Sequence, residues 1–241
     1  MEKQLYQEMY DLEENHWWFV GRRKILFDIT KRKVGRVGRI LDIGCGTGVN
    51  AKWLGELGKE VYGVEMSDEA IGLAKKRTPN LRVIKGEFPN IEINDRFDLI
   101  TLFDVLEHFE DDIAAMRKIR GMLNPGGCAV FSVPAFSFLW SEHDLLAHHK
   151  RRYTAQELQE KLVQAGFYPV RITYFNTFLF MPILFFRFMR KILGLRGGKT
   201  DFFMAPAPFN FLLAKLFGAE RFLLRFINFP FGVSLIAIAK K

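Results

Sequence analysis

The sequence predicts a doubly wound α/β fold, in which helices cover both faces of a mostly parallel sheet. The main observation is an apolar run at residues 40–43 that leads into three alternate glycines, Gly44, Gly46 and Gly48, before a helical pattern begins. Apolar runs then alternate with helical patterns as far as residue 134, and the second run ends in an acid, Glu65. A strand, a glycine turn and a helix form the first unit of such folds, whose ligands lie beyond the carboxyl ends of the strands.

The composition fits one domain of this class with elaborations. The chain has 241 residues, and 49% of them are hydrophobic, which is enough for a substantial core. Its two cysteines, Cys45 and Cys128, suggest no disulfide framework and fit a reducing compartment. The first residues lack the charged-then-apolar layout of a secretory signal. We therefore expect a cytoplasmic protein.

The net charge of +8 is confined to one part of the chain. Residues 1–170 carry 24 Lys and Arg against 25 Asp and Glu, whereas residues 171–241 carry 11 against 2. The same C-terminal part holds 15 of the 25 phenylalanines. A basic, Phe-rich segment on a near-neutral body indicates a separate surface with its own partner.

The spacing of the glycines narrows the class of ligand. A dinucleotide fingerprint, G-x-G-x-x-G/A, would need its third small residue where Val49 stands, and the third glycine comes one position earlier. A P-loop is excluded because no Lys-Ser or Lys-Thr pair follows the glycines. A nicotinamide dinucleotide site and a plain tight turn stay open as alternatives.

The run Leu-Asp-Ile-Gly-Cys-Gly-Thr-Gly at residues 41–48 resembles motif I of the class I S-adenosylmethionine (SAM)-dependent methyltransferases, in particular bacterial methyltransferases of types 11 and 23. The resemblance implies that the glycine loop passes under the methionine part of SAM and that S-adenosylhomocysteine is the product. It places these residues at the cofactor: Asp42, Gly44, Cys45, Gly46 and Gly48.

The next two strand ends are expected to bind the adenosine part of SAM. Glu65 lies 21 residues beyond Gly44, about where doubly wound folds place a carboxylate on a ribose. A carboxylate can accept from both ribose hydroxyls, and Met66 beside it is expected to pack on the adenine. By the family resemblance, Glu87 and Phe88 flank the adenine after a third strand at residues 81–84. The usual acid of the family at this place is aspartate.

The fourth strand, residues 97–103, runs into Asp-Val-Leu-Glu-His, which resembles the motif IV region of the family. There the sulfonium end of the cofactor meets the acceptor, so Phe103 and Asp104 are implied as cofactor contacts. His108 is a candidate proton acceptor because imidazole titrates near neutral pH. A structural histidine bonded to the backbone is the alternative. A helix at 111–123, a turn at 124–127 and a fifth strand at 128–134 follow.

Residues 3–33 are expected to be helical, with an aromatic segment, His-Trp-Trp-Phe, inside them. This segment resembles one seen in many bacterial methyltransferases of the class, which implies a lid formed by residues 1–37. Trp17 and Arg22 are then expected at the cofactor, and Trp18 at the acceptor. An arginine can pair bidentately with the SAM carboxylate. The alternative is a helix pair whose aromatic side chains pack on the core.

Residues 135–153 break the periodic pattern and hold three of the five histidines. The favoured interpretation is a loop over the active site that faces a polar or anionic acceptor. No metal site is expected, because no spacing matches a known zinc pattern and no cysteine joins the histidines. His-x-x-Arg-Arg-Tyr-Thr-x-x-Glu-Leu resembles an acceptor-binding stretch of related methyltransferases. The further candidates for proton acceptor are His143 and His148, and those for acceptor binding are His149, Arg151, Arg152 and Tyr153.

About fifty residues separate a sixth strand at 168–174 from the last strand at 232–239. They contain an apolar run at 178–186, which is too short to span a membrane, a break at 194–208 and an amphipathic pattern at 209–229. Three interpretations stay open: helices on a membrane surface or a lipid-linked acceptor, contact with a second subunit, and a cap on the core. Nucleic-acid binding is disfavoured, because such helices offer few polar groups to read bases.

These observations predict a Rossmann-like α/β core of seven strands with the last strand antiparallel, formed by residues 1–175 and 231–241, with a helical insertion at 176–230. The predicted function is a SAM-dependent methyltransferase that acts on a small-molecule, sugar or lipid-linked acceptor, on oxygen. The alternatives are a non-catalytic SAM-binding protein docked on a membrane or partner, and an NAD-dependent oxidoreductase. Peripheral contact with the inner face of the membrane through residues 177–229, and a homodimer, are further expectations.

Overall fold

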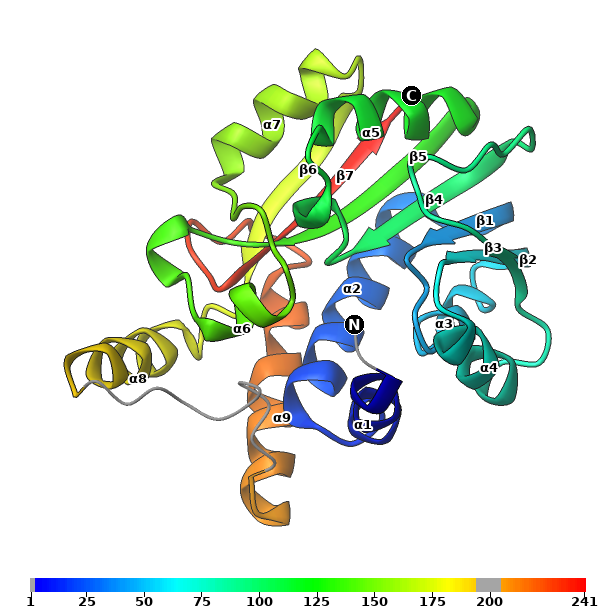
Figure 1. The fold of residues 1–241 in the computed structure, drawn as a ribbon. Coiled ribbons are helices and arrows are strands. Elements are labelled where there is room, and N and C mark those ends of the chain that lie inside the picture. Colours follow the sequence, from blue (N-terminus) through cyan, green and yellow to red (C-terminus); the bar gives the residue numbers. More distant parts are fainter. Residues whose placement is uncertain (1–2, 194–204) are drawn as a thin grey trace.

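The computed structural model describes residues 3–193 and 205–241, and in these ranges helices pack around one twisted sheet (Figure 1). The sheet has seven strands in the order β3-β2-β1-β4-β5-β7-β6. β7 is antiparallel to both of its neighbours, and the other neighbouring strands are parallel. The predicted sheet is therefore confirmed. The strands are β1 Val37–Ile43, β2 Gly58–Glu65, β3 Arg82–Lys85, β4 Phe97–Phe103, β5 Leu123–Pro134, β6 Tyr168–Phe175 and β7 Ser234–Lys240.

The helices begin where the sequence offers side-chain caps. Ser67 accepts from the amide of Ala70 at the start of α4, and Thr154 and Glu157 form a capping box at the start of α7. The expected helical stretch at the N-terminal end is a pair of helices, because the chain turns at residues 14–16. The helices are α1 Lys3–Glu13, α2 Trp17–Val34, α3 Ala51–Leu54, α4 Asp68–Arg77, α5 Asp112–Met122, α6 Glu142–Leu146, α7 Ala155–Gln164, α8 Phe180–Ile192 and α9 Ala207–Leu223, with short 3₁₀ turns η1 Leu106–His108 and η2 Ser137–Leu139.

The core lies on both faces of the central strands. Ile40 and Leu41 of β1 and Ile100 of β4 are completely buried, although their side chains point to opposite faces of the sheet. Strands covered on both faces carry continuous apolar runs instead of alternating ones, which is the pattern that these segments show.

The fifth strand begins earlier than the sequence predicts. The turn expected at residues 124–127 lies inside β5, because the pairing with β4 steps from Leu123 directly to Cys128. The intervening residues bulge out of the ladder, with Gly126 in the left-handed region at φ 77°. Asn124 is held there by donating to the carboxylate of Asp98 at 2.7 Å.

The insertion between β6 and β7 packs on the N-terminal helices of the same chain. In Figure 1, α9 (orange) lies alongside α2 (blue). The ring of Phe217 is fully buried against Gly21, where a Cβ atom would overlap it. At the two ends of this contact, Asn210 accepts from the amide of Trp17 at 2.8 Å and Arg225 pairs with Asp28 at 2.7 Å. One face of α9 therefore belongs to the body of the protein.

The rest of the insertion exposes apolar side chains. The predicted second helix ends earlier than residue 229, because the chain turns after Leu223. The break expected at 194–208 lies mostly outside the described residues. Within the described ranges, none of the helices has the length and apolarity needed to cross a membrane. The exposed residues of α8, α9 and the turn after α9 include Met181, Phe185, Phe188, Ile192, Phe209, Phe211, Leu212, Leu216, Phe222 and Phe226.

A buried carboxylate joins α9 to the end of β6. Glu220 is completely buried and accepts from the amides of Asn176 at 2.7 Å and Phe178 at 2.8 Å. These bonds favour the charged form, but burial outweighs them and raises the pKa of Glu220 from 4.5 to about 7. The position of α8 and α9 relative to the sheet depends on this contact.

The close approach of α2 and α9 predicts that alanine at Gly21 destabilises the protein, whereas alanine at Gly72, which lies outside this contact, should stabilise it. Gly21→Ala should lower the free energy of unfolding by about 1–3 kcal/mol, because the new methyl group overlaps Phe217. Gly72→Ala, in α4, should raise it by about 0.5–1 kcal/mol, since this exposed site has open space and alanine favours the helix. Urea unfolding measures both, and an equal effect at the two sites would contradict the contact.

The raised pKa of Glu220 predicts a pH dependence of stability. Between pH 4.5 and about 7 the folded protein holds a proton that the unfolded chain releases, so the free energy of unfolding should fall as the pH rises. The fall from this group should be at most about 3 kcal/mol. Urea unfolding at about pH 5 and about pH 7.5 should show a steeper fall in the wild type than in Glu220→Gln. Parallel curves for the two proteins would rule out Glu220 as the source.

Candidate cofactor site and active site

The glycine loop after β1 has the backbone that the sequence predicts. Gly44, Gly46 and Gly48 all lie in the left-handed region, with φ between 53° and 78°, where other residues are strained. A side chain at Gly44 would also collide with Val105, which follows β4. The loop is fixed to β2 by the amides of Gly44 and Cys45, which both donate to the carbonyl of Val64. The loop therefore lies at the carboxyl ends of three adjacent strands.

Glu65 lies directly beside this loop, as its position at the end of β2 predicts. One carboxylate oxygen accepts from the amide of Gly46 at 3.1 Å, and the other accepts from the amides of Met66 and Ser67 at 2.9 Å. These bonds fix the orientation of the carboxylate, and the oxygen bonded to Gly46 has a second lone pair for a hydroxyl donor. Met66 is 60% exposed next to it, which leaves its side chain open to a ligand.

Burial shifts two groups under the loop toward their neutral forms. Asp42 is buried and accepts from the Thr101 hydroxyl at 2.6 Å, and burial raises the pKa of Asp42 to about 7. Burial also raises the pKa of the Cys45 thiol far above its usual range. Cys45 is therefore not a nucleophile at neutral pH, since the thiolate is the reactive form.

A partly buried ion pair joins α2 to the ends of β4 and β5. The Arg22 guanidinium lies 2.6 Å from the Asp104 carboxylate and donates to the Ser132 hydroxyl at 3.0 Å. It also lies over the rings of Trp18 and Phe103, at 5.2 Å and 5.8 Å from their centroids. The structure thus brings together the predicted residues Trp18, Arg22, Phe103 and Asp104.

The remaining residues that were predicted to contact the cofactor lie in three different environments. They are Trp17, Glu87 and Phe88. Trp17 packs edge-on against Phe217 of α9, with ring centroids 6.1 Å apart. Phe88, which precedes a cis peptide bond to Pro89, is buried against Phe109. Glu87 is exposed at the carboxyl end of β3 and remains accessible.

A second anchor, which the sequence analysis missed, fastens α1 to the glycine loop. The buried carboxylate of Glu13 pairs with Arg77 of α4 and accepts from the hydroxyl of Thr47. The Arg77 guanidinium also lies 4.0 Å from the centroid of the Tyr10 ring. Glu13, Thr47 and Arg77 are far apart in the sequence and form no local pattern, so this anchor could not be predicted from the sequence.

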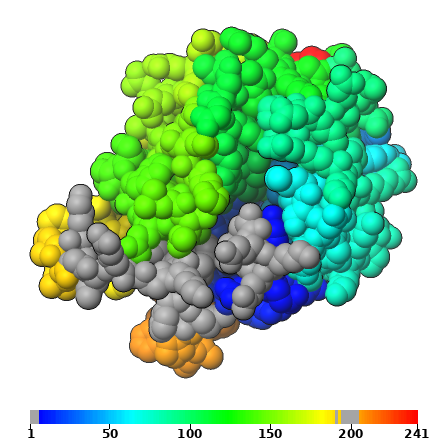
Figure 2. Space-filling model, in the orientation of Figure 1, coloured from blue at the N-terminus to red at the C-terminus, as the bar shows by residue number. Residues whose placement is uncertain are grey.

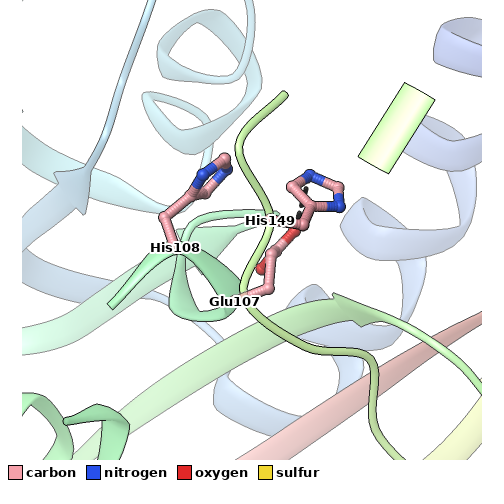
Figure 3. A group of neighbouring side chains, drawn as sticks. All are labelled: Glu107, His108 and His149. Atoms are coloured by element: carbon pink, nitrogen blue, oxygen red, sulfur yellow. Dashed lines mark ion pairs between the residues drawn. The ribbon is translucent and has the colours of Figure 1, made fainter. Parts of the chain in front are cut away.

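The histidines gather around a buried acid at the start of the segment after β4. Glu107 is completely buried, and burial together with the Asp104 charge raises the pKa of Glu107 well above its usual value. His149 lies 3.8 Å from it and contacts Asp144 at 2.9 Å through Nδ1. The His108 and His149 rings are 4.8 Å apart, and burial lowers the pKa of His108 to about 4. In Figure 3 the Glu107 carboxylate points toward the His149 ring, with His108 beside them. We call Glu107, His108 and His149 the Glu107 cluster.

The remaining predicted residues lie around this cluster in different settings. His143 is near it, with its ring 5.9 Å from that of His149. His148 is exposed and adopts a left-handed backbone at φ 58°. Neither residue belongs to the Glu107 cluster, and their role as proton acceptors stays a prediction.

Three residues that were predicted to bind the acceptor are bonded within the protein. Arg152 is buried and forms two 2.8 Å bonds to Asp144. Tyr153 is 1% exposed and donates to Asp112 at 2.8 Å. Arg151 contacts Asp112 at 3.0 Å and is partly exposed. We therefore reassign Arg152 and Tyr153 to holding the 141–153 loop on the sheet, because their polar groups already have partners.

Comparisons with known proteins agree with this geometry. A family model described as a methyltransferase domain matches residues 21–172. The chain is 30% identical over 140 residues to a ubiquinone biosynthesis O-methyltransferase of Alkalilimnicola ehrlichii, covering 51% of this chain and 56% of that protein. It is 27% identical over 159 residues to a probable S-adenosylmethionine-dependent methyltransferase of Mycolicibacterium smegmatis, covering 65% and 61%. The chain thus spans little more than half the length of these relatives.

Solved structures share the fold over nearly the whole chain. The N-methyltransferase NodS from Bradyrhizobium japonicum WM9, in complex with S-adenosylhomocysteine, matches with a TM-score of 0.60 and 17% identity, over 99% of this chain and 97% of that one. The plantazolicin methyltransferase BpumL matches with a TM-score of 0.62 and 18% identity, over 99% and 89%. At these identities the comparison concerns the fold alone.

Proposed function

The chain belongs to the class I S-adenosylmethionine-dependent methyltransferases, and we propose that it moves the methyl group of this cofactor to an acceptor oxygen. The observation that carries the proposal is the left-handed glycine loop with the Glu65 carboxylate bonded to its Gly46 amide. The predicted cofactor is that of the family. Similarity to an O-methyltransferase favours oxygen as the methylated atom.

We assign the contacts to SAM from the strand ends. The glycine loop would lie under the methionine part, with Asp42 and Cys45 supporting it from below. Glu65 would accept from the ribose hydroxyls, because its carboxylate already has a fixed orientation. Met66, Glu87 and the backbone at Phe88 would border the adenine.

The Arg22–Asp104 pair would close the site at the methionine end. Its atoms lie where β4 and β5 end, beside the glycine loop, and the Phe103 ring packs under the guanidinium. Asp104 would accept from the amino group of SAM, and Arg22 would face its carboxylate. Trp18 covers Arg22 and would face the acceptor, whereas we assign Trp17 to joining the lid to α9.

The chemistry requires little from the protein beyond orientation. The sulfonium of SAM is a strong electrophile, so the acceptor oxygen must be aligned with the methyl group and must lose its proton. We propose that the acceptor lies between the Asp104 turn and the 141–153 loop, next to His149 and the exposed edge of Arg151. His108, His143 and His148 border this place and would receive the proton.

The Glu65 assignment predicts a loss of cofactor affinity. Glu65→Gln removes the negative charge from the ribose site, so the affinity for SAM should fall at least about tenfold. Glu60→Gln, on the exposed part of the same strand, should bind SAM like the wild type. Calorimetric titration with SAM measures both, with thermal unfolding to show that each variant is folded.

Two results would contradict the proposed function. One is a wild-type protein that binds NAD and not SAM in the same titration. The other is an absence of S-adenosylhomocysteine formation across phenolic, quinol and sugar acceptors, despite tight SAM binding. The second result would favour a SAM-binding protein without catalysis.

We propose further that the exposed face of the insertion contacts the inner face of the membrane and gives access to a lipid-linked acceptor. In Figure 2, α8 (yellow) and α9 (orange) protrude at the lower border of the molecule. Phe226 is 86% exposed and Phe185 is 67% exposed, and on α9 the Lys215 ammonium lies 4.3 Å from the centroid of the exposed Phe211 ring. Basic, Phe-rich faces suit anionic lipid surfaces, because the rings enter the interface while the cations face the headgroups.

Substitutions on this face should separate membrane binding from folding. Replacing Phe185, Phe188 and Phe226 by Ser should weaken co-sedimentation with anionic vesicles at least about tenfold, because each buried aromatic ring contributes roughly 1.5–3 kcal/mol. Val163→Ser, on exposed α7, is the matched control. High salt should release part of the wild type.

The same experiment distinguishes a membrane from a second subunit. A wild-type protein that stays in the supernatant, or a triple variant that sediments like the wild type, would overturn the membrane proposal. If sedimentation fails while the molar mass in solution rises with concentration, and the triple variant stays a monomer, this face is a homodimer interface.

A further inference from the structure

The Glu107 cluster brings together three side chains that commonly bind metal ions. One candidate ligand atom from each of Glu107, His108 and His149 lies within 4.8 Å of the other two. Glu107 and His108 belong to η1, directly after β4, whereas His149 comes from the loop after α6, as Figure 3 shows. The sequence could not indicate this group by spacing, because its two parts are distant in the chain.

The Glu107 carboxylate lacks a hydrogen-bond donor elsewhere in the described ranges, although the His149 ring lies 3.8 Å from it. Both of its oxygens are buried, and no donor from another described residue forms a hydrogen bond with them. The nearest guanidinium groups are already paired, Arg22 with Asp104 and Arg152 with Asp144. A buried carboxylate normally either pairs with a cation, coordinates a metal ion or stays protonated. Here the guanidinium groups have other partners, and the His149 ring is shared with Asp144.

The His149 ring is oriented as a metal ligand is. Its Nδ1 atom contacts the Asp144 carboxylate at 2.9 Å, which leaves Nε2 on the opposite side of the ring as the candidate ligand atom. That Nε2 atom faces Glu107 at 3.8 Å. Metal-binding histidines usually donate their other ring nitrogen to a carboxylate in this way, which fixes the tautomer and the ring. The Arg152 fork holds Asp144 in place for this role.

We propose that Glu107, His108 and His149 bind a divalent transition-metal ion, for which Zn²⁺ is the best fit. Two imidazoles and one carboxylate are a known ligand set for zinc, whereas Mg²⁺ and Ca²⁺ prefer oxygen ligands. Bonds of about 2.0–2.1 Å would put the ligand atoms about 3.3 Å apart, so the cluster must contract. The partly buried His108 ring can supply most of this movement by rotating about its side-chain bonds.

The proposed site would keep a coordination position open toward the acceptor. Three protein ligands leave a fourth position for an oxygen ligand, and a bound hydroxyl loses its proton more readily. With His108 bonded to the ion, His143 and His148 would remain to receive that proton. This use of the ion rests on the proposed function, whereas metal binding itself does not.

The test measures metal binding without any acceptor. The full chain, purified without a histidine tag and treated with EDTA, is titrated with ZnCl₂ in a calorimeter. Wild type should bind about one ion per chain, and Glu107→Gln and His149→Gln should bind at least about tenfold more weakly. Glu160→Gln, an exposed acid on α7, is the matched control and should bind like the wild type. Co²⁺ in place of Zn²⁺ should give the visible absorption of a low-coordinate site in the wild type and the control, and not in Glu107→Gln or His149→Gln.

The outcomes are distinguishable from failure of the proposed function. If the wild type binds no Zn²⁺ beyond the level of Glu107→Gln, or if all variants bind alike, the metal site is overturned, whatever the result of the SAM titration. Should a buried variant fail to fold, His108→Gln replaces it, because this ring is partly exposed. Loss of Zn²⁺ binding with unchanged SAM affinity would support the site as separate from the cofactor.

Discussion

The ion pair between the buried Arg22 and the partly exposed Asp104 determines how the parts of this protein are placed. It fixes α2 on the sheet at the point where β4 and β5 end. α2 in turn carries α9 through the contact of Gly21 with Phe217, so the insertion is attached to the sheet partly through this pair. Asp104 also begins the left-handed turn that leads to Glu107 and His108. Removing one partner would leave an uncompensated buried charge, which commonly costs about 3–5 kcal/mol.

The buried carboxylates of this chain show how differently one chemical group can be stabilised. Asp144 accepts from the Arg152 guanidinium and contacts the His149 ring, and these partners lower the pKa of Asp144 below its usual range. Glu220 has two backbone amides, and the pKa of Glu220 is raised only to about 7. Asp42 has one hydroxyl donor, and Glu107 has no donor from another described residue. The series indicates that charged partners compensate burial, single neutral donors do so in part, and Glu107 needs a proton or a metal ion.

The features that depend on residues close together in the chain could be predicted from the sequence. The glycine loop, the carboxylate at the end of β2 and the strand pattern each follow from neighbouring residues. The sequence was insufficient where distant residues meet. Three contacts of this kind join segments that are distant in the chain, so no local sequence pattern predicts them. They are the Glu13–Arg77 ion pair, the packing of Phe217 on Gly21, and the approach of His149 to Glu107. Arg152 and Tyr153 resembled ligand-binding residues because burial cannot be read from a polar side chain alone.

The docking of α9 on α2 bears on the order in which the molecule is assembled during synthesis. Trp17 and Asn210 are 193 positions apart, so the surface beneath α2 is incomplete until most of the chain has left the ribosome. Until then the aromatic rings of α2 lack their cover, and an exposed apolar helix is a target for aggregation or chaperones. Closing so long a loop is also slow, because its entropy must be lost before the contact forms. A nascent chain would therefore form its glycine loop well before α9 packs on α2.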